Sequence, residues 1–302
     1  MSSTGVVERV ERLNRASAKR VIDPDVDLLG NVGDGQLIAD ELLSVHGLGL
    51  ELTAEQKRTL SREEVASMFD NGIRFEAVLE AGFVAQADDI AAPRITYLFH
   101  EMGEETRHQR LFQRVIRQIG PTARNPLAAN ILIRWFDRVG TRWILNHPAT
   151  LYTMVISGEE IPDLLQKLAS EHPDTDPFLA TVNRYHRQEE ARHLSFARSM
   201  LPDVWAKAGR GERWGIHHVV PVAIRQMYEF LVHPGVYETI GLDGWATWKA
   251  VNRSPERTAI RQEATRPILG ALIDAGMISS RRVPKGWQHL CGVPARVDRS
   301  TL

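Results

Sequence analysis

The chain has 302 residues, 43% of them hydrophobic and 25% charged, which is the balance of an ordinary globular protein with a sizeable core. Its formal net charge of −1 gives no bulk electrostatic attraction to nucleic acid or to an anionic membrane. Cys291 is the only cysteine, so no intrachain disulfide can form. The polar start lacks the apolar run of a secretory signal, and no segment approaches the roughly 20 apolar residues of a membrane span. We therefore expect a cytoplasmic protein.

The chain divides into an irregular start and a long helical remainder. Residues 1–52 are expected to form an N-terminal extension, partly irregular, with a short amphipathic helix at 6–18. Residues 53–302 are expected to form a single all-α domain, because no segment alternates cleanly between apolar and polar residues as a half-buried strand does. The helices are predicted at 62–89, 93–119, 127–145, 151–170, 176–200, 219–232 and 255–275.

Local signals set the expected ends of these helices. Thr53 with Gln56 and Ser61 with Glu64 are two capping-box patterns in succession, and the first long helix is expected to follow the second of them. Pro202 is expected to end the helix at 176–200, because proline cannot continue the backbone hydrogen bonding.

The most informative feature is an internal repeat. The sequence EETRH at 104–108 recurs as EEARH at 189–193. In each copy a carboxylate and an imidazole, Glu105 with His108 and Glu190 with His193, lie one turn apart on one helix face. Two such Glu-x-x-His helices, together with one Glu from each of two other helices, hold a di-iron or di-manganese centre in four-helix bundles.

This pattern predicts one more glutamate on the helix before each motif. Antiparallel helices of about 20 residues joined by a short turn place facing positions roughly 25 to 35 residues apart. Glu76 lies 29 residues before Glu105 (105 − 76), and Glu159 lies 31 before Glu190 (190 − 159). Both have apolar neighbours, where an ionised carboxylate is costly unless a cation compensates it. Glu76 and Glu159 are therefore the preferred candidates.

Nearby acids leave alternatives open. Glu80 lies one turn after Glu76, and Glu160 is adjacent to Glu159. Glu101 lies one turn before the first motif on the same face and is expected to support a ligand from behind. A lone Glu-x-x-His usually marks a solvated helix face, but two copies with upstream carboxylates at matching distances favour a metal centre.

A further histidine shares the face of the second motif. His186 lies four residues before Glu190, so this helix would present His186, Glu190 and His193 together. The spacing alone leaves open whether His186 is a ligand or a histidine of the core.

These segments resemble the p-aminobenzoate N-oxygenases, non-haem di-iron enzymes built on a ferritin-like helical bundle. The resemblance is carried by NGIRFE at 71–76, EMGEETRHQ at 101–109, EEIPD at 159–163 and HxxxEARH at 186–193, and it spans roughly residues 53–201. The extra histidine that sets this family apart matches His186. Carried over by position, the implied metal ligands are Glu76, Glu105, His108, Glu159, His186, Glu190 and His193.

The resemblance also implies a fold and a reaction. The fold is a ferritin-like four-helix bundle with additional packing helices, its di-iron core at 62–201 and accessory helices at 202–302. Two iron ions, with manganese as a substitute, would activate dioxygen as a peroxo species and oxidise the nitrogen of an aminobenzoate-like arylamine to a hydroxylamine or nitro group. Iron suits mixed carboxylate and imidazole ligation because it cycles between oxidation states. The electrons would come from a reductase or ferredoxin.

Basic and aromatic residues supply candidates for supporting roles. Arg107 and Arg192 each precede a motif histidine and are expected to pair with neighbouring acids. A substrate carboxylate calls for an Arg or Tyr near the pocket, and the sequence does not choose among Arg94, Tyr97, Tyr152 and Arg225.

Other functions share parts of this pattern. Iron-storage bundles are normally shorter chains, and the tryptophan-rich segment after residue 201 favours extra packing or a homodimer interface. A radical-generating reductase subunit usually has a tyrosine one turn beyond the first ligand histidine, where this chain has Phe112. A di-iron hydroxylase or desaturase shares every ligand argument and stays open. A metal-dependent hydrolase is disfavoured because seven protein ligands leave little room for an activated water.

Overall fold

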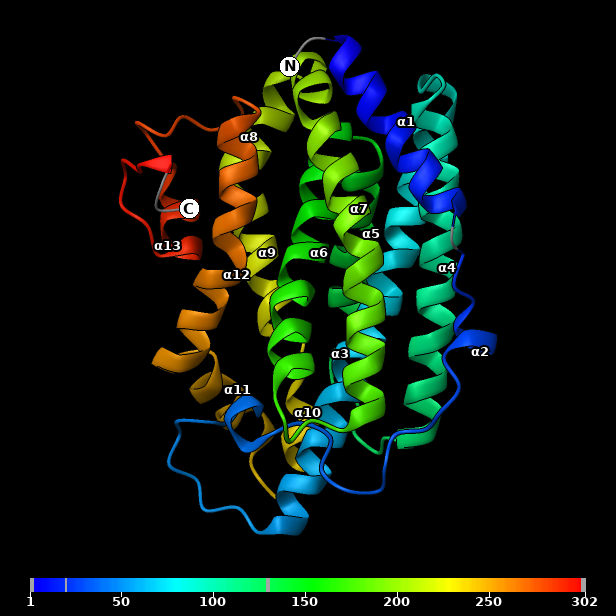
Figure 1. Ribbon diagram of the computed structural model, residues 1–302. Helices are drawn as coiled ribbons and strands as arrows, with labels where there is room; N and C mark the ends of the chain where they lie inside the picture. The colour runs from blue at the N-terminus through cyan, green and yellow to red at the C-terminus, as the bar shows by residue number, and fades with distance from the viewer. Residues whose placement is uncertain (1–2, 20, 129–130, 300–302) are drawn as a thin grey trace.

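The computed structural model describes residues 3–19, 21–128 and 131–299, and no strand occurs within them. Two helical hairpins form a central bundle, in which α3 packs along α4 and α6 packs along α7 (Figure 1). The four helices are α3 (Ala54–Gln86), α4 (Arg94–Ile119), α6 (Pro148–Glu171) and α7 (Pro177–Lys207). The all-α bundle expected from the sequence is confirmed.

The remaining helices surround this bundle. The N-terminal α1 (Ser3–Lys19) lies against α4 and α7, and α2 (Pro24–Asp27) lies against α4. Helix α5 (Ile131–Leu145) packs against α3 and α6, and α12 (Pro255–Asp274) packs along the far side of α6 (Figure 1). The others are α8 (Arg210–His218), α9 (Val220–Glu229), α10 (Pro234–Glu238), α11 (Gly244–Val251) and α13 (Lys285–Cys291), with short 3₁₀ turns at Asp40–Leu42 and Ala87–Asp89.

The first bundle helix begins earlier than predicted. The Thr53 hydroxyl accepts a hydrogen bond from the Gln56 backbone N–H, and the Gln56 side chain bonds back to the Thr53 backbone, which completes a capping box. The expected start at Ser61 was wrong. The Ser61 hydroxyl lies inside α3, where it donates to the Arg58 carbonyl and accepts from the Leu37 N–H. The first capping signal, at Thr53, therefore starts the helix, whereas Ser61 of the second signal makes a tertiary contact with Leu37.

The last bundle helix also runs further than predicted. Pro202 was expected to end it, but α7 continues to Lys207. Proline costs about 3 kcal/mol inside a helix, while full burial of one large aliphatic side chain contributes roughly 1.5 to 3 kcal/mol. Leu201 and Val204 are both buried beside Pro202, so their packing offsets the broken hydrogen bond.

Two apolar clusters fill the bundle, one toward each end. One contains Phe83 and Tyr97, and the other contains Phe69 and Val115. Along α3 and α4 the buried residues between these clusters are polar, and the same holds on α7 between Tyr185 and Leu194. The fold therefore encloses a polar layer between two apolar layers.

The helices of the described chain lack the features of membrane spans. Within residues 3–19, 21–128 and 131–299, none is both long enough and apolar enough to cross a bilayer.

Candidate metal centre

The predicted ligands converge in the polar layer of the bundle. Each of the four bundle helices contributes, and no residue of the set is more than 3% exposed. Glu76 comes from α3, Glu105 and His108 from α4, Glu159 from α6, and His186, Glu190 and His193 from α7.

Glu105 and Glu190 form the middle of the site, because both face both motif histidines. His108 Nδ1 lies 3.2 Å from Glu105 Oε2 and 3.1 Å from Glu190 Oε1. His193 Nδ1 lies 3.1 Å from Glu105 Oε1 and 2.8 Å from Glu190 Oε2. Each carboxylate thus turns one oxygen to each histidine, which is the placement needed to bridge two cations.

Three groups of side chains each bring donor atoms within 4.8 Å of one another in the described part of the chain. The groups are Glu76, His108 and His186; Glu105, His108 and Glu190; and Glu101, Glu105 and His193. Six of the seven predicted ligands belong to at least one group. The seventh, Glu159, lies close enough to Glu190 for that carboxylate to help raise the pKa of Glu159. Glu101, expected only to support a ligand, belongs to a group itself.

The two alternative acids face elsewhere. Arg198 pairs with the Glu160 carboxylate on another side of α6. Glu80 accepts a hydrogen bond from the Thr106 hydroxyl at 3.1 Å. The geometry therefore favours Glu76 over Glu80 and Glu159 over Glu160.

The outward nitrogens of the motif histidines are held by the first glutamate of the opposite motif. Glu104 Oε2 lies 2.8 Å from His193 Nε2, and Glu189 Oε2 lies 3.0 Å from His108 Nε2. Arg192 forms ion pairs with Glu104 at 2.9 Å and with Glu189 at 3.3 Å. Arg107 lies 4.0 Å from the Glu104 carboxylate and 3.9 Å from the Glu189 carboxylate. The expected pairing of Arg107 and Arg192 with neighbouring acids is observed, but Glu104 and Glu189 had no predicted role. The doubled glutamate of each motif was the signal for them.

His186 is oriented by a different partner. Its Nδ1 donates to Gln166 Oε1 at 3.0 Å, so its Nε2 faces Glu76 Oε1 and Glu190 Oε1, each 3.4 Å away. Phe112 lies over the His186 ring with a centroid distance of 4.9 Å. His186 therefore presents a lone pair toward the carboxylates.

Burial and charge shift the titration of the whole cluster. Burial, reinforced by neighbouring carboxylates, raises the pKa of Glu76 and Glu159 well above the ordinary value. Burial alone opposes the charged form of His193, but the carboxylates of Glu190 and Glu105 outweigh it and raise the pKa of His193 well above its usual range. Burial lowers the pKa of His186 to about 4. Glu76, Glu159 and His193 therefore hold protons tightly at positions where the cluster could hold cations.

Unpartnered oxygens show that the residues fit metal ions. Glu76 Oε2 and both oxygens of Glu101 are buried and have no hydrogen-bond partner. A buried ionised carboxylate without a partner is costly. Carboxylate oxygens mixed with imidazole nitrogens are donors suited to iron and to manganese. The set therefore fits two divalent cations held between Glu105 and Glu190.

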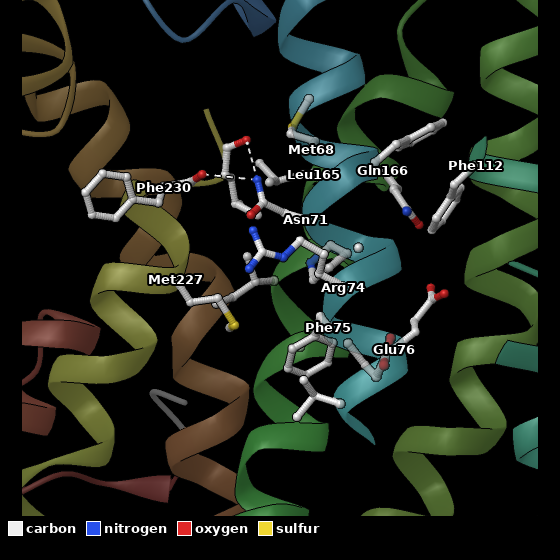
Figure 2. A pocket seen from close by; sticks show the side chains of 18 of the residues that line it. Met68, Asn71, Arg74, Phe75, Glu76, Phe112, Leu165, Gln166, Met227 and Phe230 are labelled. Carbon is white, nitrogen blue, oxygen red and sulfur yellow. Dashed lines mark hydrogen bonds between the residues drawn. The ribbon is translucent and has the colours of Figure 1, made fainter. Parts of the chain in front are cut away.

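A cavity of about 720 Å³ adjoins the centre. Glu76, Glu159 and His186 line one part of it, and the rest of its wall is mainly apolar. In Figure 2, Phe112, Gln166 and Glu76 lie on one side, while Asn71 and Arg74 face Phe230 and Met227 on the other. The helices that contribute to the lining are α3, α4, α5, α6, α7 and α9. A molecule in this cavity would reach the predicted ligands directly.

The residues suggested for binding a substrate carboxylate do not line this cavity. Arg94 pairs with Asp203, and Arg225 pairs with Glu229. Tyr97 and Tyr152 are buried in the apolar cluster that contains Phe83. The arginines that do reach the cavity, Arg74 and Arg138, were not singled out, because a helix-face argument does not show which segments wrap a pocket.

A ferritin-like bundle that carries two inward Glu-x-x-His helices defines the class of dinuclear carboxylate proteins. The chain belongs to the family of P-aminobenzoate N-oxygenase AurF, whose model matches residues 4–276. This family has a ferritin-like helical fold and consists of di-iron oxygenases, so membership supports an oxygenase. The match extends well beyond residues 53–201, where the resemblance was visible in motifs.

The chain is also similar to curated proteins from mycobacteria. The chain is 26% identical over 240 residues to "Uncharacterized protein Rv0885" of Mycobacterium tuberculosis (strain ATCC 25618 / H37Rv). It has the same identity over the same length to "Uncharacterized protein Mb0909" of Mycobacterium bovis. Each alignment covers 76% of this chain and 70% of the relative. Their names assign no substrate.

Proposed function

We propose that this protein is a di-iron N-oxygenase that oxidises the nitrogen of an aromatic amine. The observation that carries the proposal is the large, mainly apolar cavity that meets the predicted ligands Glu76, Glu159 and His186. Family membership supports an oxygenase, and the cavity supports a substrate with an apolar body.

The metal ions would be held by the set that the geometry brings together. Glu105 and Glu190 would bridge, and the other ligands would be Glu76, His108, Glu159, His186 and His193. When bound, the two iron ions supply the reduction of dioxygen and the transfer of one oxygen atom to the substrate.

The protein's own groups hold this arrangement and exclude water. Gln166 fixes the ring of His186 through a buried hydrogen bond. Glu104 and Glu189 accept from the outward nitrogens of the motif histidines and so leave Nδ1 free to bind. The apolar wall keeps the substrate's ring out of water and directs its polar nitrogen to the acidic end of the cavity.

The reaction needs electrons from outside the protein. One arylamine, one dioxygen, two electrons and two protons give one arylhydroxylamine and one water. The new bond joins nitrogen to oxygen, and the O–O bond breaks. A reductase or ferredoxin would supply the two electrons, and further rounds would carry the hydroxylamine toward a nitro group.

The size of the cavity favours a substrate larger than a single ring. A cavity of about 720 Å³ is within the range that holds drug-sized ligands. We therefore place aminobenzoate among the small substrates and expect better turnover of arylamines with a second ring or an apolar chain.

The proposal can be tested by loading the protein anaerobically with ferrous iron and counting the metal. Isotopically labelled dioxygen and a chemical reductant are then added, with either p-aminobenzoate or 4′-aminobiphenyl-4-carboxylate, and products are identified by mass spectrometry. We expect about two irons per chain and label on the amine nitrogen, with the two-ring amine preferred. Leu165 lines the cavity, so the matched variant Leu165→Trp should narrow it. This variant should lose turnover of the two-ring amine before that of p-aminobenzoate and should still bind two irons.

Other results would each overturn a defined part of the proposal. The protein could bind two irons and consume oxygen, yet place the label on carbon or leave both amines unlabelled. This result would exclude arylamine N-oxygenation and favour the hydroxylase or desaturase alternative. Two irons without any organic product would favour an iron-binding protein. Folded protein without stoichiometric iron would overturn the centre itself.

A further inference from the structure

Glu101 differs from the other buried glutamates of the described chain. Its side chain is 0% exposed, and neither carboxylate oxygen has a hydrogen-bond partner. Buried glutamates outside the centre do have partners: Glu64 accepts from Ser44, and Glu63 accepts from the Thr122 backbone. Burial of a carboxylate with both oxygens unpartnered is costly, so a cation beside Glu101 would stabilise its charged form.

The position of Glu101 says where that charge would be. Glu101, Glu105 and His193 each offer a donor atom, all within 4.8 Å of one another. The corresponding group at the other end of the centre contains Glu76 and His186. Glu101 thus stands beside His193, at the end of the centre away from His186.

The internal repeat relates these two ends. Glu101 lies four residues before Glu105, as His186 lies four residues before Glu190, and each glutamate is followed by a histidine three residues on. Positions spaced in this way share one face of an α-helix. Glu101 on α4 therefore occupies the place that His186 occupies on α7.

We propose that Glu101 is itself a metal ligand, bound to the ion next to His193 as the counterpart of His186 at the other ion. This inference rests on the dinuclear centre of the proposed function. With Glu101 the protein would supply five carboxylates, namely Glu76, Glu101, Glu105, Glu159 and Glu190, and the two ions would differ in charge environment. One ion would have the neutral His186 as its extra ligand and the other the anionic Glu101.

The test is metal binding by the full chain with Glu101→Gln, which keeps the size of the side chain and removes its charge. Cobalt(II) and anaerobic ferrous iron serve as probes, with metal counted after dialysis against a chelator and cobalt followed by its visible absorption. Wild type is expected to hold about two ions per chain. Glu101→Gln is expected to hold one ion tightly and the second at least ~10-fold more weakly, since loss of even an outer partner of a metal ligand costs about that much.

Two further variants keep the result interpretable. Glu64→Gln neutralises another buried glutamate of the same bundle, away from the centre, and should hold two ions. Glu101→His would place in the first half the donor that the second half carries, and should recover the second ion. Metal-free Glu101→Gln should melt no lower than metal-free wild type, because it loses an unpartnered buried charge, and metal should raise its melting temperature less.

The outcomes separate this inference from the proposed function. Two ions in Glu101→Gln, with wild-type affinity and an unchanged cobalt spectrum, would overturn the ligand role of Glu101 and leave the dinuclear centre standing. If the wild-type protein bound no metal, both the dinuclear centre and the ligand role of Glu101 would be overturned. Loss of the second ion in Glu64→Gln as well would show a general effect of neutralising buried acids and would also overturn the inference.

Discussion

His193 Nε2 lies 2.8 Å from Glu104 Oε2, although the two residues belong to different copies of the repeated motif. The same relationship joins His108 Nε2 to Glu189 Oε2 at 3.0 Å. Each motif therefore contributes an inward Glu and His to the predicted ligand set and an outward Glu that fixes the histidine of the other motif. The repeat works as a pair across the α4–α7 contact, so neither copy is complete alone.

This cross-pairing predicts that Glu104→Ala weakens metal binding without removing a ligand. His193 would lose the acceptor that sets its tautomer, and Arg192 would lose its nearest carboxylate. Loss of such a partner typically costs 10- to 100-fold in affinity, and we expect a decrease of about that size. Competition with a chelator of known affinity measures it. The control is Glu80→Gln, which should bind metal as wild type does; a matching loss there would mean that Glu80, not Glu76, faces the centre.

The sequence was sufficient to predict that these side chains converge, because the spacing of the predicted ligands is local. A Glu and a His three residues apart share a face whatever the helix packs against, so Glu105, His108, Glu190 and His193 follow from the repeat. The partners Glu104 and Glu189 lie on a neighbouring face of the same helices, and their use depends on how α4 meets α7. That packing does not follow from the spacing of residues along a single helix.

Helix ends and the cavity were less predictable for a related reason. Ser61 and Pro202 carry the local signals of a start and a stop, and tertiary burial outweighs both. The cavity is lined from six helices that are spread along the sequence, so Arg74 and Arg138 could not be distinguished from other arginines. Features set by local residue spacing could be predicted from the sequence, whereas features set by packing between distant segments could not.

A second prediction concerns the orientation of His186. Gln166→Leu removes the acceptor of the Nδ1 hydrogen, so His186 Nε2 would no longer be held toward Glu76. We expect about a 10-fold or greater loss of affinity for the ion on that side, with the other ion retained. Gln166→Glu keeps an acceptor oxygen and serves as the matched control. Equal metal affinity in both variants and in wild type would show that Gln166 does not position His186.

A third prediction uses a buried acid outside the centre. Burial raises the pKa of Glu64 to about 7 from 4.5, although hydrogen bonds from Ser44 partly oppose this. An acid with a raised folded pKa binds its proton more tightly when folded. Its contribution to stability is therefore complete below pH 4.5 and is lost as the pH rises through 7. A shift of this size corresponds to about 3 kcal/mol.

Glu64→Gln should remove this dependence. We expect the variant to gain about 2 to 3 kcal/mol relative to wild type on going from pH 5 to pH 8, measured as the free energy of urea unfolding of metal-free protein. Glu55→Gln, on the exposed start of α3, is the control and should follow wild type within a few tenths of a kcal/mol. A constant difference between Glu64→Gln and wild type at both pH values would contradict a raised pKa of Glu64.

The last prediction tests the close approach of α3 and α6 beside the centre. A Cβ at Gly158 would lie 1.7 Å from Cε1 of the Phe75 ring, so Gly158→Ala must push away a rigid aromatic side chain. Gly158 is adjacent to Glu159, and Phe75 is adjacent to Glu76, so the displacement would reach two predicted ligands. We expect a loss of about 1 to 3 kcal/mol in unfolding free energy and weaker metal binding.

Gly140→Ala separates this steric effect from the general effect of replacing a helical glycine. A Cβ at Gly140 on α5 meets nothing within 4 Å, so alanine there should stabilise the protein by roughly 0.5 to 1 kcal/mol. The double variant Gly158→Ala with Phe75→Leu replaces the ring by a smaller side chain and should recover part of the lost stability and metal affinity. If Gly158→Ala alone were as stable as Gly140→Ala, α3 and α6 would not be in contact at Gly158 and Phe75. The position of Phe75 in the cavity wall would then be wrong.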